Sequence, residues 1–175
     1  MKSSDKKEGK KKRLDIGCGN SKMPDCTYLD VDPQAHPDIL HDLNKFPYPI
    51  ADNSFDEVFA KHIIEHLNDP IKFMAEMTRI LKPGGTIFIA TPHFSCRVAY
   101  SEPQHKLFYS YFMFPSITQG LPLKVLEQKI TFYKSFRWSG ISLLANKYPD
   151  QYERFWTYIF PAENVTYLAR KQNKK

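Results

Sequence analysis

The first half of the chain alternates between short apolar runs and stretches with a helical pattern. The apolar runs predict five strands, at Arg13–Ile16, Thr27–Asp30, Asp38–Asp42, Ser54–Ala60 and Thr86–Ala90. Two helices are predicted between the last two strands, one over His62–Leu67 and one that begins at Pro70 with apolar positions three and four apart. This order favours an α/β fold, in which a parallel sheet carries helices on its faces.

Local signals mark both ends of the longer helix. Asp69 is a residue type that caps helices, and Pro70 suits the first helical position, where no N–H is needed. The run Lys82-Pro83-Gly84-Gly85 predicts where this helix ends. Earlier in the chain, Pro24 leaves little room for a full helix between the first two strands.

The second half of the chain has a different character. Residues 94–160 hold 17 of the 25 aromatic residues. Most such side chains pack in cores, and exposed ones offer flat apolar surfaces to ligands. The pattern predicts a strand at Val125–Tyr133, helices at Ser139–Lys147 and Asp150–Phe160, and a last strand at Asn164–Ala169.

The charge is unevenly distributed. The chain has 175 residues, which is enough for one domain, and a net charge of +6. Residues 1–13 carry +5 and residues 170–175 carry +4, which leaves −3 for residues 14–169. We therefore predict a disordered basic tail over 1–12, a single domain over 13–170 and a basic tail over 171–175. A mildly acidic body disfavours nucleic acid as a partner.

Three absences bear on location. No apolar run reaches the ~18 residues of a membrane span, and the lysine-rich start lacks the apolar stretch of a secretory signal. The three cysteines, Cys18, Cys26 and Cys96, are odd in number and form no Cys-x-x-Cys pair. These features predict a cytoplasmic protein without a disulfide framework. The oligomeric state is left open.

The most informative segment runs from Leu14 to Asp30. An apolar strand ends in a turn that contains Gly17 and Gly19, and the next strand ends on Asp30. Glycines let the backbone turn tightly and approach a ligand closely. A carboxylate at the tip of the next strand can accept hydrogen bonds from both ribose hydroxyls. The segment therefore predicts an adenosine site.

Five motifs in order resemble the class I S-adenosylmethionine-dependent methyltransferases, in particular the group called methyltransferase type 11. They are Asp15–Gly19, Leu29–Pro33, Phe55–Val58, Glu65–Leu67 and Leu81–Gly85. Each is weak alone, but their order within a strand–helix alternation makes a specific signal over about residues 13–92. The resemblance implies a Rossmann-like, doubly wound, seven-stranded sheet that is mostly parallel with an antiparallel last strand.

The resemblance also implies a site. S-adenosyl-L-methionine is the expected cofactor, with contacts from Asp15, Gly17, Cys18, Gly19, Asn20, Asp30, Val31, Asp42, Leu43, Lys61 and His62. Residues 94–120 lie where relatives build a substrate lid, so an aromatic-rich helical lid is expected there. The gap from Gly19 to Asp30 is short, which implies that the usual first helix is trimmed or absent.

The acceptor side is predicted from position and chemistry. His93 follows the fifth strand and is the first candidate for a general base, with His105 and Tyr100 next. A structural role in the loop is the alternative for His93. The expected acceptor is a small molecule or glycan, methylated on oxygen, because a histidine is available where the fifth strand ends. No Asp/Asn-Pro-Pro-Tyr/Phe signature, the usual mark of amino-group methylation of nucleic-acid bases, follows the fourth strand at Ala60–Ile63. RNA or protein acceptors have only the basic tails in their favour.

Three other interpretations compete. His62-Ile-Ile-Glu-His66 spells an inverted zinc-peptidase pattern, but no third ligand is evident, so no metal is predicted. A dinucleotide fold needs a third glycine where Lys22 stands. A non-catalytic S-adenosylmethionine-binding module also remains open, because fold does not determine function.

Overall fold

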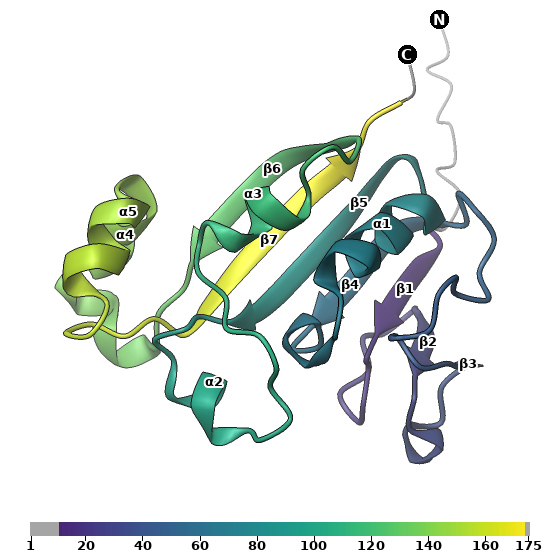
Figure 1. Cartoon of the computed structure of the whole chain (residues 1–175), viewed down its shortest axis with the longest axis horizontal. Coiled ribbons are helices and arrows are strands. Elements are labelled where there is room, and N and C mark those ends of the chain that lie inside the picture. Colours follow the sequence, from purple (N-terminus) through teal and green to yellow (C-terminus); the bar gives the residue numbers. More distant parts are fainter. Residues whose placement is uncertain (1–10, 174–175) are drawn as a thin grey trace, which may run out of the picture.

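The computed structural model describes residues 11–173, and a seven-stranded sheet is its centre (Figure 1). The strand order is β3-β2-β1-β4-β5-β7-β6, and β7 alone runs antiparallel to its neighbours. This confirms the predicted Rossmann-like fold. The strands are β1 Arg13–Ile16, β2 Thr27–Asp30, β3 Ile39–Leu40, β4 Phe55–Lys61, β5 Leu81–Pro92, β6 Leu123–Ile130 and β7 Asn164–Lys171.

Helix α1, Pro70–Ile80, is the longest helix of the described chain, and its ends follow the predicted signals. The Asp69 side chain accepts a hydrogen bond from the Lys72 amide at 2.9 Å, and Pro70 occupies the first turn. The helix ends before Leu81, but β5 begins there directly, so the Pro83–Gly85 segment lies within the strand. A Cβ on Gly85 would lie 2.9 Å from the Asp56 carbonyl, so glycine permits this close pairing.

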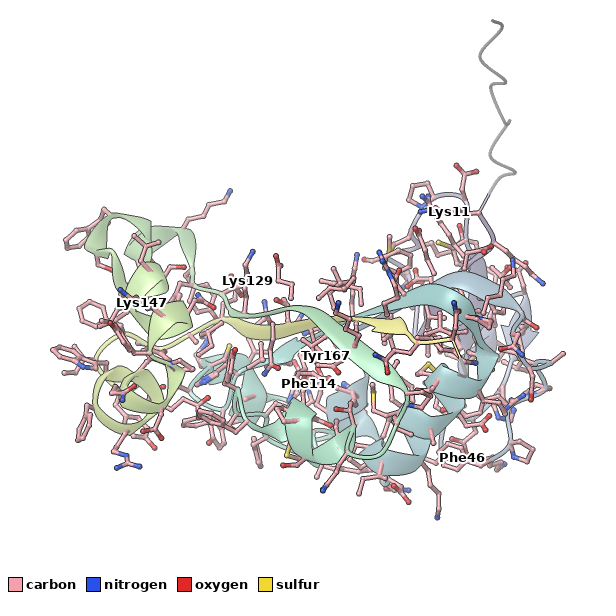
Figure 2. All side chains as sticks on the ribbon, turned by 90° about the horizontal axis from the view of Figure 1, so that it is seen from above. Lys11, Phe46, Phe114, Lys129, Lys147 and Tyr167 are labelled. Carbon is pink, nitrogen blue, oxygen red and sulfur yellow. The ribbon has the colours of Figure 1, made fainter. Side chains whose placement is uncertain are left out.

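One face of the sheet carries the main core. Figure 2 shows α1 and α3, Met113–Ile117, on the same side of the sheet, while Lys129 points to the other. Phe114 of α3 stacks on Tyr167 of β7 with ring centroids 4.7 Å apart, and both are fully buried. Helix α1 adds Phe73, Met74, Met77 and Ile80 to this core.

The opposite face is less covered. Within residues 11–173, no helix joins β1 to β2, as the short gap predicted. From the switch point between β1 and β4, the chain moves to one side of the sheet through β2 and to the other side through β5. Since both connections are right-handed, a helix between β1 and β2 would cover the face opposite to the one that α1 covers. Loss of the β1–β2 helix therefore uncovers the face opposite α1, where Phe59, Phe88 and Leu168 are only partly buried.

The remaining elements differ more from the predictions. The segment predicted as a helix over 62–67 forms only one 3-10 turn, Ile64–His66. The helix predicted over 150–160 is divided into α5, Pro149–Gln151, and a π-helical turn, Tyr152–Trp156. Helix α4, Ile141–Lys147, and β6 fall within two or three residues of their predicted bounds. Residues 94–120 hold α2, Arg97–Ser101, and α3, and their role as a lid stays a prediction.

The predicted tails lie mainly outside the described residues, although Lys171 is the last residue of β7. No helix within residues 11–173 has the length and apolar character needed to cross a membrane.

Candidate cofactor site

The turn after β1 lies at the carboxyl edge of the parallel strands, beside the point where the strand order reverses. Gly17 has φ +65°, and its amide donates to the Leu29 carbonyl of β2 at 2.8 Å. A Cβ at this position would lie 2.6 Å from Cγ1 of Ile63. The turn therefore requires glycine for both its left-handed backbone and its close approach to the segment after β4.

Asp30 at the end of β2 is held by two backbone amides. The Gly19 amide donates to Oδ2 at 2.9 Å, and the Asp32 amide donates to Oδ1 at 3.0 Å. The residue is 8% exposed. A carboxylate oxygen has two lone pairs, so each oxygen retains capacity to accept from a ligand hydroxyl. Asp30 is thus oriented in advance for a diol.

Two hollows open at this edge and share Gly17. The smaller, about 110 Å³, is lined by Gly17, Asp30, Val31, Asp42, Leu43, Asn44, Ile63, His66 and Leu67. The larger, about 410 Å³, is lined by Asp15, Gly17, Cys18, Gly19, Asn20, Ser21, Lys61 and His62. All eleven residues predicted to contact the cofactor line one of these two hollows. That they bind S-adenosylmethionine remains a prediction.

The larger hollow is lined by a buried carboxyl group, Asp15, whose pKa is raised. Asp15 is 3% exposed, and burial raises the pKa of its carboxyl, against a hydrogen bond from the Met23 amide and the charge of Lys61. Burial, followed by the charges of Asp30 and Asp15, also raises the pKa of the Cys18 thiol. The hollow therefore holds one buried carboxyl, Asp15, and one ammonium, Lys61.

Known methyltransferases match the part of the sequence that lines the two hollows. The family described as "Methyltransferase domain" matches residues 14–89. Demethylmenaquinone methyltransferase of Renibacterium salmoninarum is 35% identical over 72 residues, which is 41% of this chain and 25% of that protein. Ajmaline N-methyltransferase of Rauvolfia serpentina is 51% identical over 43 residues, which is 25% of this chain and 14% of that protein. The chain thus spans a quarter or less of either relative.

The fold agrees with the sequence. A S-adenosylmethionine-dependent methyltransferase from Archaeoglobus fulgidus superposes with a TM-score of 0.71 at 16% identity, over 92% of this chain and 86% of that one. Residues 14–89 match the methyltransferase family, and the fold is that of this S-adenosylmethionine-dependent methyltransferase. The predicted resemblance is confirmed, and S-adenosyl-L-methionine is the cofactor of this family.

His93 follows β5 but lines neither hollow. It is fully buried, and the Ser95 amide donates to its Nδ1 at 3.1 Å. Since Nδ1 accepts, the proton of the neutral ring lies on Nε2, which is 3.1 Å from Oε1 of Glu153. Both ring nitrogens are therefore engaged within the protein.

The other two predicted acceptor-side residues lie together after β5. Tyr100 is 65% exposed and stacks on Phe108, with ring centroids 4.6 Å apart and planes 18° apart. His105 is partly buried, and its Nδ1 lies 3.0 Å from the Ala99 carbonyl. A carbonyl only accepts, so Nδ1 carries the proton and Nε2 keeps its lone pair.

Sequence reasoning assigned no role to Glu65 or His66 of the methyltransferase motif. Glu65 is 1% exposed, and His66 lines the smaller hollow. His62, which the zinc-peptidase pattern placed on the same helix face as His66, has φ +52° and precedes the 3-10 turn. The signal that pointed to Glu65 and His66 was their place in the motif, but it did not indicate their spatial neighbours.

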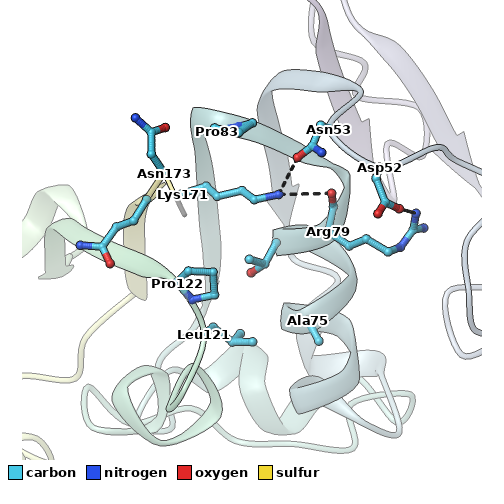
Figure 3. Close-up of a pocket in the computed structure, with 11 residues that line it drawn as sticks. Asp52, Asn53, Ala75, Arg79, Pro83, Leu121, Pro122, Lys171 and Asn173 are labelled. Carbon is cyan, nitrogen blue, oxygen red and sulfur yellow. Dashed lines mark hydrogen bonds and ion pairs between the residues drawn. The ribbon is translucent and has the colours of Figure 1, made fainter. Parts of the chain in front are cut away.

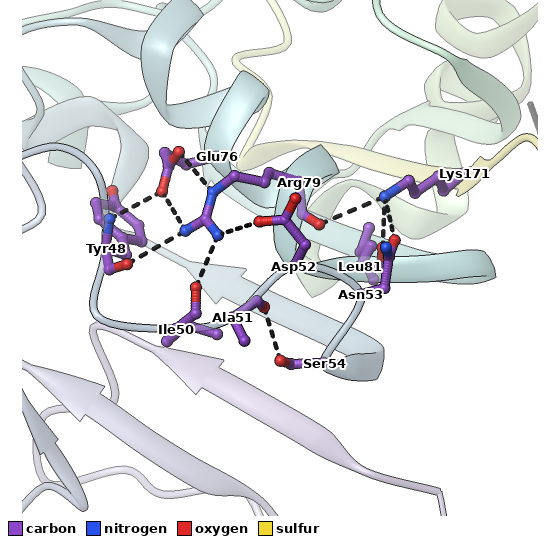
Figure 4. Close-up of polar contacts among 10 residues, drawn as sticks. All are labelled: Tyr48, Ile50, Ala51, Asp52, Asn53, Ser54, Glu76, Arg79, Leu81 and Lys171. Carbon is purple, nitrogen blue, oxygen red and sulfur yellow. Dashed lines mark hydrogen bonds and ion pairs between the residues drawn. The ribbon is translucent and has the colours of Figure 1, made fainter.

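A larger cavity, about 650 Å³, lies at the opposite edge of the sheet (Figure 3). Its charged side chains are held by the protein itself (Figure 4). The Arg79 guanidinium contacts Glu76, Asp52 and the carbonyls of Ile50 and Tyr48. The Lys171 ammonium contacts Asn53 and the Leu81 carbonyl. This network joins α1, β5 and β7 to the loop before β4. The charged side chains of the cavity therefore have a structural role, which is to hold these elements together.

Proposed function

We propose that this protein transfers a methyl group from S-adenosyl-L-methionine to an oxygen atom of a small-molecule or glycan-type acceptor. The observation that carries the proposal is the pair of hollows that share Gly17 at the switch point of the sheet. The cofactor consists of an adenosine joined to a methionine, and two joined hollows of different chemistry suit its two halves. Open parallel sheets bind ligands at this place.

The smaller hollow suits the nucleoside. Asp30 would accept hydrogen bonds from the ribose hydroxyls through the lone pairs that its two amide contacts leave available. Val31 is 61% exposed and offers apolar surface to the adenine ring. Asp42 and Leu43 would meet the adenine edge, and the Asn44 amide holds the Asp42 carboxylate in place at 3.0 Å.

The larger hollow suits the methionine part. Asp15 lines this hollow, and its carboxylate would face the positively charged groups of the ligand, an ammonium and a sulfonium. Lys61, which follows β4 in the same hollow, would meet the ligand carboxylate. The turn from Gly17 to Gly19 presents backbone in place of bulky side chains.

The protein's part in the chemistry is to hold and align the acceptor. The cofactor supplies an activated methyl group when it is bound. Residues at the carboxyl edge would fix the acceptor oxygen in line with the bond that breaks, and such orientation lowers a barrier by roughly 7–11 kcal/mol. The exposed Tyr100–Phe108 pair offers a flat apolar platform for a sugar or an aromatic acceptor.

Among the three predicted catalytic residues, His105 retains a free ring nitrogen and His93 does not. We therefore assign His105 to the acceptor side and His93 to positioning the loop after β5. The basis is the hydrogen-bond inventory of the two rings. Tyr100 contributes as part of the platform.

The proposal is tested by incubating the full chain with methyl-labelled cofactor and a cell extract separated by size. We expect label in the low-molecular-weight or glycan fraction, stable to treatments that cleave methyl esters. Label confined to RNA or protein would move the acceptor to those classes. Calorimetric binding of cofactor with no labelled product across all fractions would favour the non-catalytic module and contradict transfer.

A further inference from the structure

We propose that Glu65, His66 and His105 form a binding site for a divalent transition metal, with zinc as the best chemical match. One carboxylate oxygen and two imidazole nitrogens lie within 4.8 Å of one another. Glu65 and His66 belong to the 3-10 turn after β4, and His105 belongs to the loop after α2. Metal binding does not depend on the methyltransferase activity. A metal held here uses the Nε2 lone pair of His105, so His105 would then take part on the acceptor side as a metal ligand and not as a free base.

The buried carboxylate of Glu65 is the first reason. Its Oε2 accepts a hydrogen bond from Oγ1 of Thr91 at 3.0 Å. Its Oε1 is buried and accepts no hydrogen bond from the residues that the structure describes. The nearest ring nitrogens are Nδ1 of His62 at 3.6 Å and Nε2 of His105 at 4.0 Å. A buried, unpaired carboxylate oxygen is costly, and a cation held against it would remove that cost.

The second reason is that both histidines have the hydrogen-bonding pattern of metal-bound histidines. Nδ1 of His105 faces the Ala99 carbonyl at 3.0 Å, and Nδ1 of His66 faces the Gln104 carbonyl at 3.3 Å. Each carbonyl holds the proton on Nδ1 and leaves the Nε2 lone pair for a ligand. A backbone acceptor on the second ring nitrogen is the arrangement that orients metal-bound histidines and raises their basicity.

The donor atoms of Glu65, His66 and His105, and the distances between them, indicate which metal the site would bind. Zinc binds imidazole nitrogen and carboxylate oxygen at about 2.0–2.2 Å, so two ligands of a tetrahedral site lie roughly 3.3–3.6 Å apart. The 4.0 Å between Oε1 of Glu65 and Nε2 of His105, and the separations of up to 4.8 Å within the cluster, are longer than this spacing. The three side chains would therefore move inward when the metal binds. Two imidazoles and one carboxylate suit zinc, whereas magnesium and calcium prefer all-oxygen sets.

The proposed metal site lies between the loop after α2 and the 3-10 turn, so a bound metal would link these two segments. Amides of Lys106 and Leu107 already donate to the Glu65 carbonyl at 2.8 and 3.2 Å, and the rings of His66 and His105 pack at 4.7 Å. A metal would fasten this loop to the 3-10 turn. Because His66 lines the smaller hollow, the bound metal would order the wall between that hollow and the Tyr100–Phe108 platform. Three protein ligands leave one coordination position open.

The test is a zinc titration of the full chain, stripped of metal, in competition with a chromogenic chelator. We expect one equivalent to bind, and Glu65→Gln, His66→Asn and His105→Asn each to weaken binding by about tenfold or more. His36→Asn is the matched control, because His36 is exposed, lies outside the cluster and has a left-handed backbone that asparagine tolerates. This control should bind zinc as the unmodified chain does.

A second measurement covers variants that fail to fold. Cobalt added to the unmodified chain should give the intense visible absorption of a four-coordinate site, and one equivalent of zinc should abolish it. No stoichiometric zinc binding, or a cobalt spectrum of the six-coordinate aqueous ion, would overturn the proposal. Equal loss of affinity in His36→Asn and His105→Asn would also overturn it, since binding would then be general to histidines.

Discussion

The Gly19 amide donates a 2.9 Å hydrogen bond to Oδ2 of Asp30, which ties the turn after β1 to the tip of β2. One carboxylate thus shapes the glycine turn and faces the smaller hollow. Asp30→Ala should therefore weaken cofactor binding by about 1–3 kcal/mol, or roughly 5- to 150-fold, because ribose hydroxyls lose their acceptor. Calorimetry with the cofactor and its demethylated product measures this change.

Asp150→Ala is the charge-matched control for that measurement. Asp150 is exposed, and its carboxylate lies 3.5 Å from the Arg154 guanidinium. Its loss should leave cofactor affinity unchanged. Equal affinity in Asp30→Ala and the unmodified chain would remove the ribose assignment.

Gly17→Ala should destabilise the fold as well as the site. The new Cβ would lie 2.6 Å from Cγ1 of Ile63 and would occupy a left-handed backbone with φ +65°. We expect a loss of roughly 1–3 kcal/mol in the free energy of unfolding. Adding Ile63→Ala removes the clashing atoms, so the double variant should recover part of the loss relative to the sum of the single changes. Strict additivity in urea unfolding would show that the clash is absent.

Asp15→Asn should stabilise the protein near pH 7. Burial raises the pKa of Asp15, so the unfolded chain ionises first as pH rises through the ordinary value of 3.8, and folding stability falls. Asparagine keeps an acceptor for the Met23 amide at 3.0 Å without that charge. The melting temperature of the variant should exceed that of the unmodified chain at pH 7, and the difference should vanish below about pH 3.8. A lower melting temperature at pH 7 would contradict this.

Arg79→Met should destabilise the edge opposite the cofactor site by about 1–3 kcal/mol. Burial by itself raises the pKa of Glu76, but hydrogen bonds from Arg79 and the Tyr48 amide outweigh it and lower the pKa. This depressed pKa stabilises the fold above the ordinary value of 4.5, and the contribution is lost as pH falls through the folded pKa. The variant should therefore show less acid dependence of unfolding below about pH 4.5. An unchanged acid profile would show that Arg79 does not set the Glu76 pKa.

His93→Asn should lower stability more than it lowers turnover per folded molecule. The buried ring links Ser95 to Glu153, and its loss removes one of the two hydrogen bonds to Oε1 of Glu153, which then keeps the bond from the Tyr111 amide. Unfolding curves and turnover corrected for the folded fraction separate the two effects. A large loss of kcat in a fully folded variant would restore His93 as the base.

Local signals in the sequence predicted much of the fold because the forces that create those elements act between near neighbours. The bounds of β1 and β2 and the start of α1 at Pro70 follow from apolar runs, a capping aspartate and a proline. The start of β5 was misjudged, since Leu81–Gly85 became strand only by pairing with β4. The helix predicted over 62–67 shortened because His62 takes a left-handed backbone and its amide donates to Ala90 of β5 at 2.8 Å.

By itself, the sequence determined which residues meet at the proposed cofactor site. Those residues follow strands directly, and the carboxyl ends of parallel strands must meet at one edge, so order along the chain was enough to bring Asp15, Gly17, Asp30 and Lys61 together. Only the tertiary structure decided the acceptor side. It engaged both nitrogens of His93, left Nε2 of His105 free, and brought that nitrogen to 4.0 Å from the buried Glu65 carboxylate. The loop after α2 has no periodic pattern, and its path is set by packing and by its hydrogen bonds to the Glu65 carbonyl, which no local signal encodes.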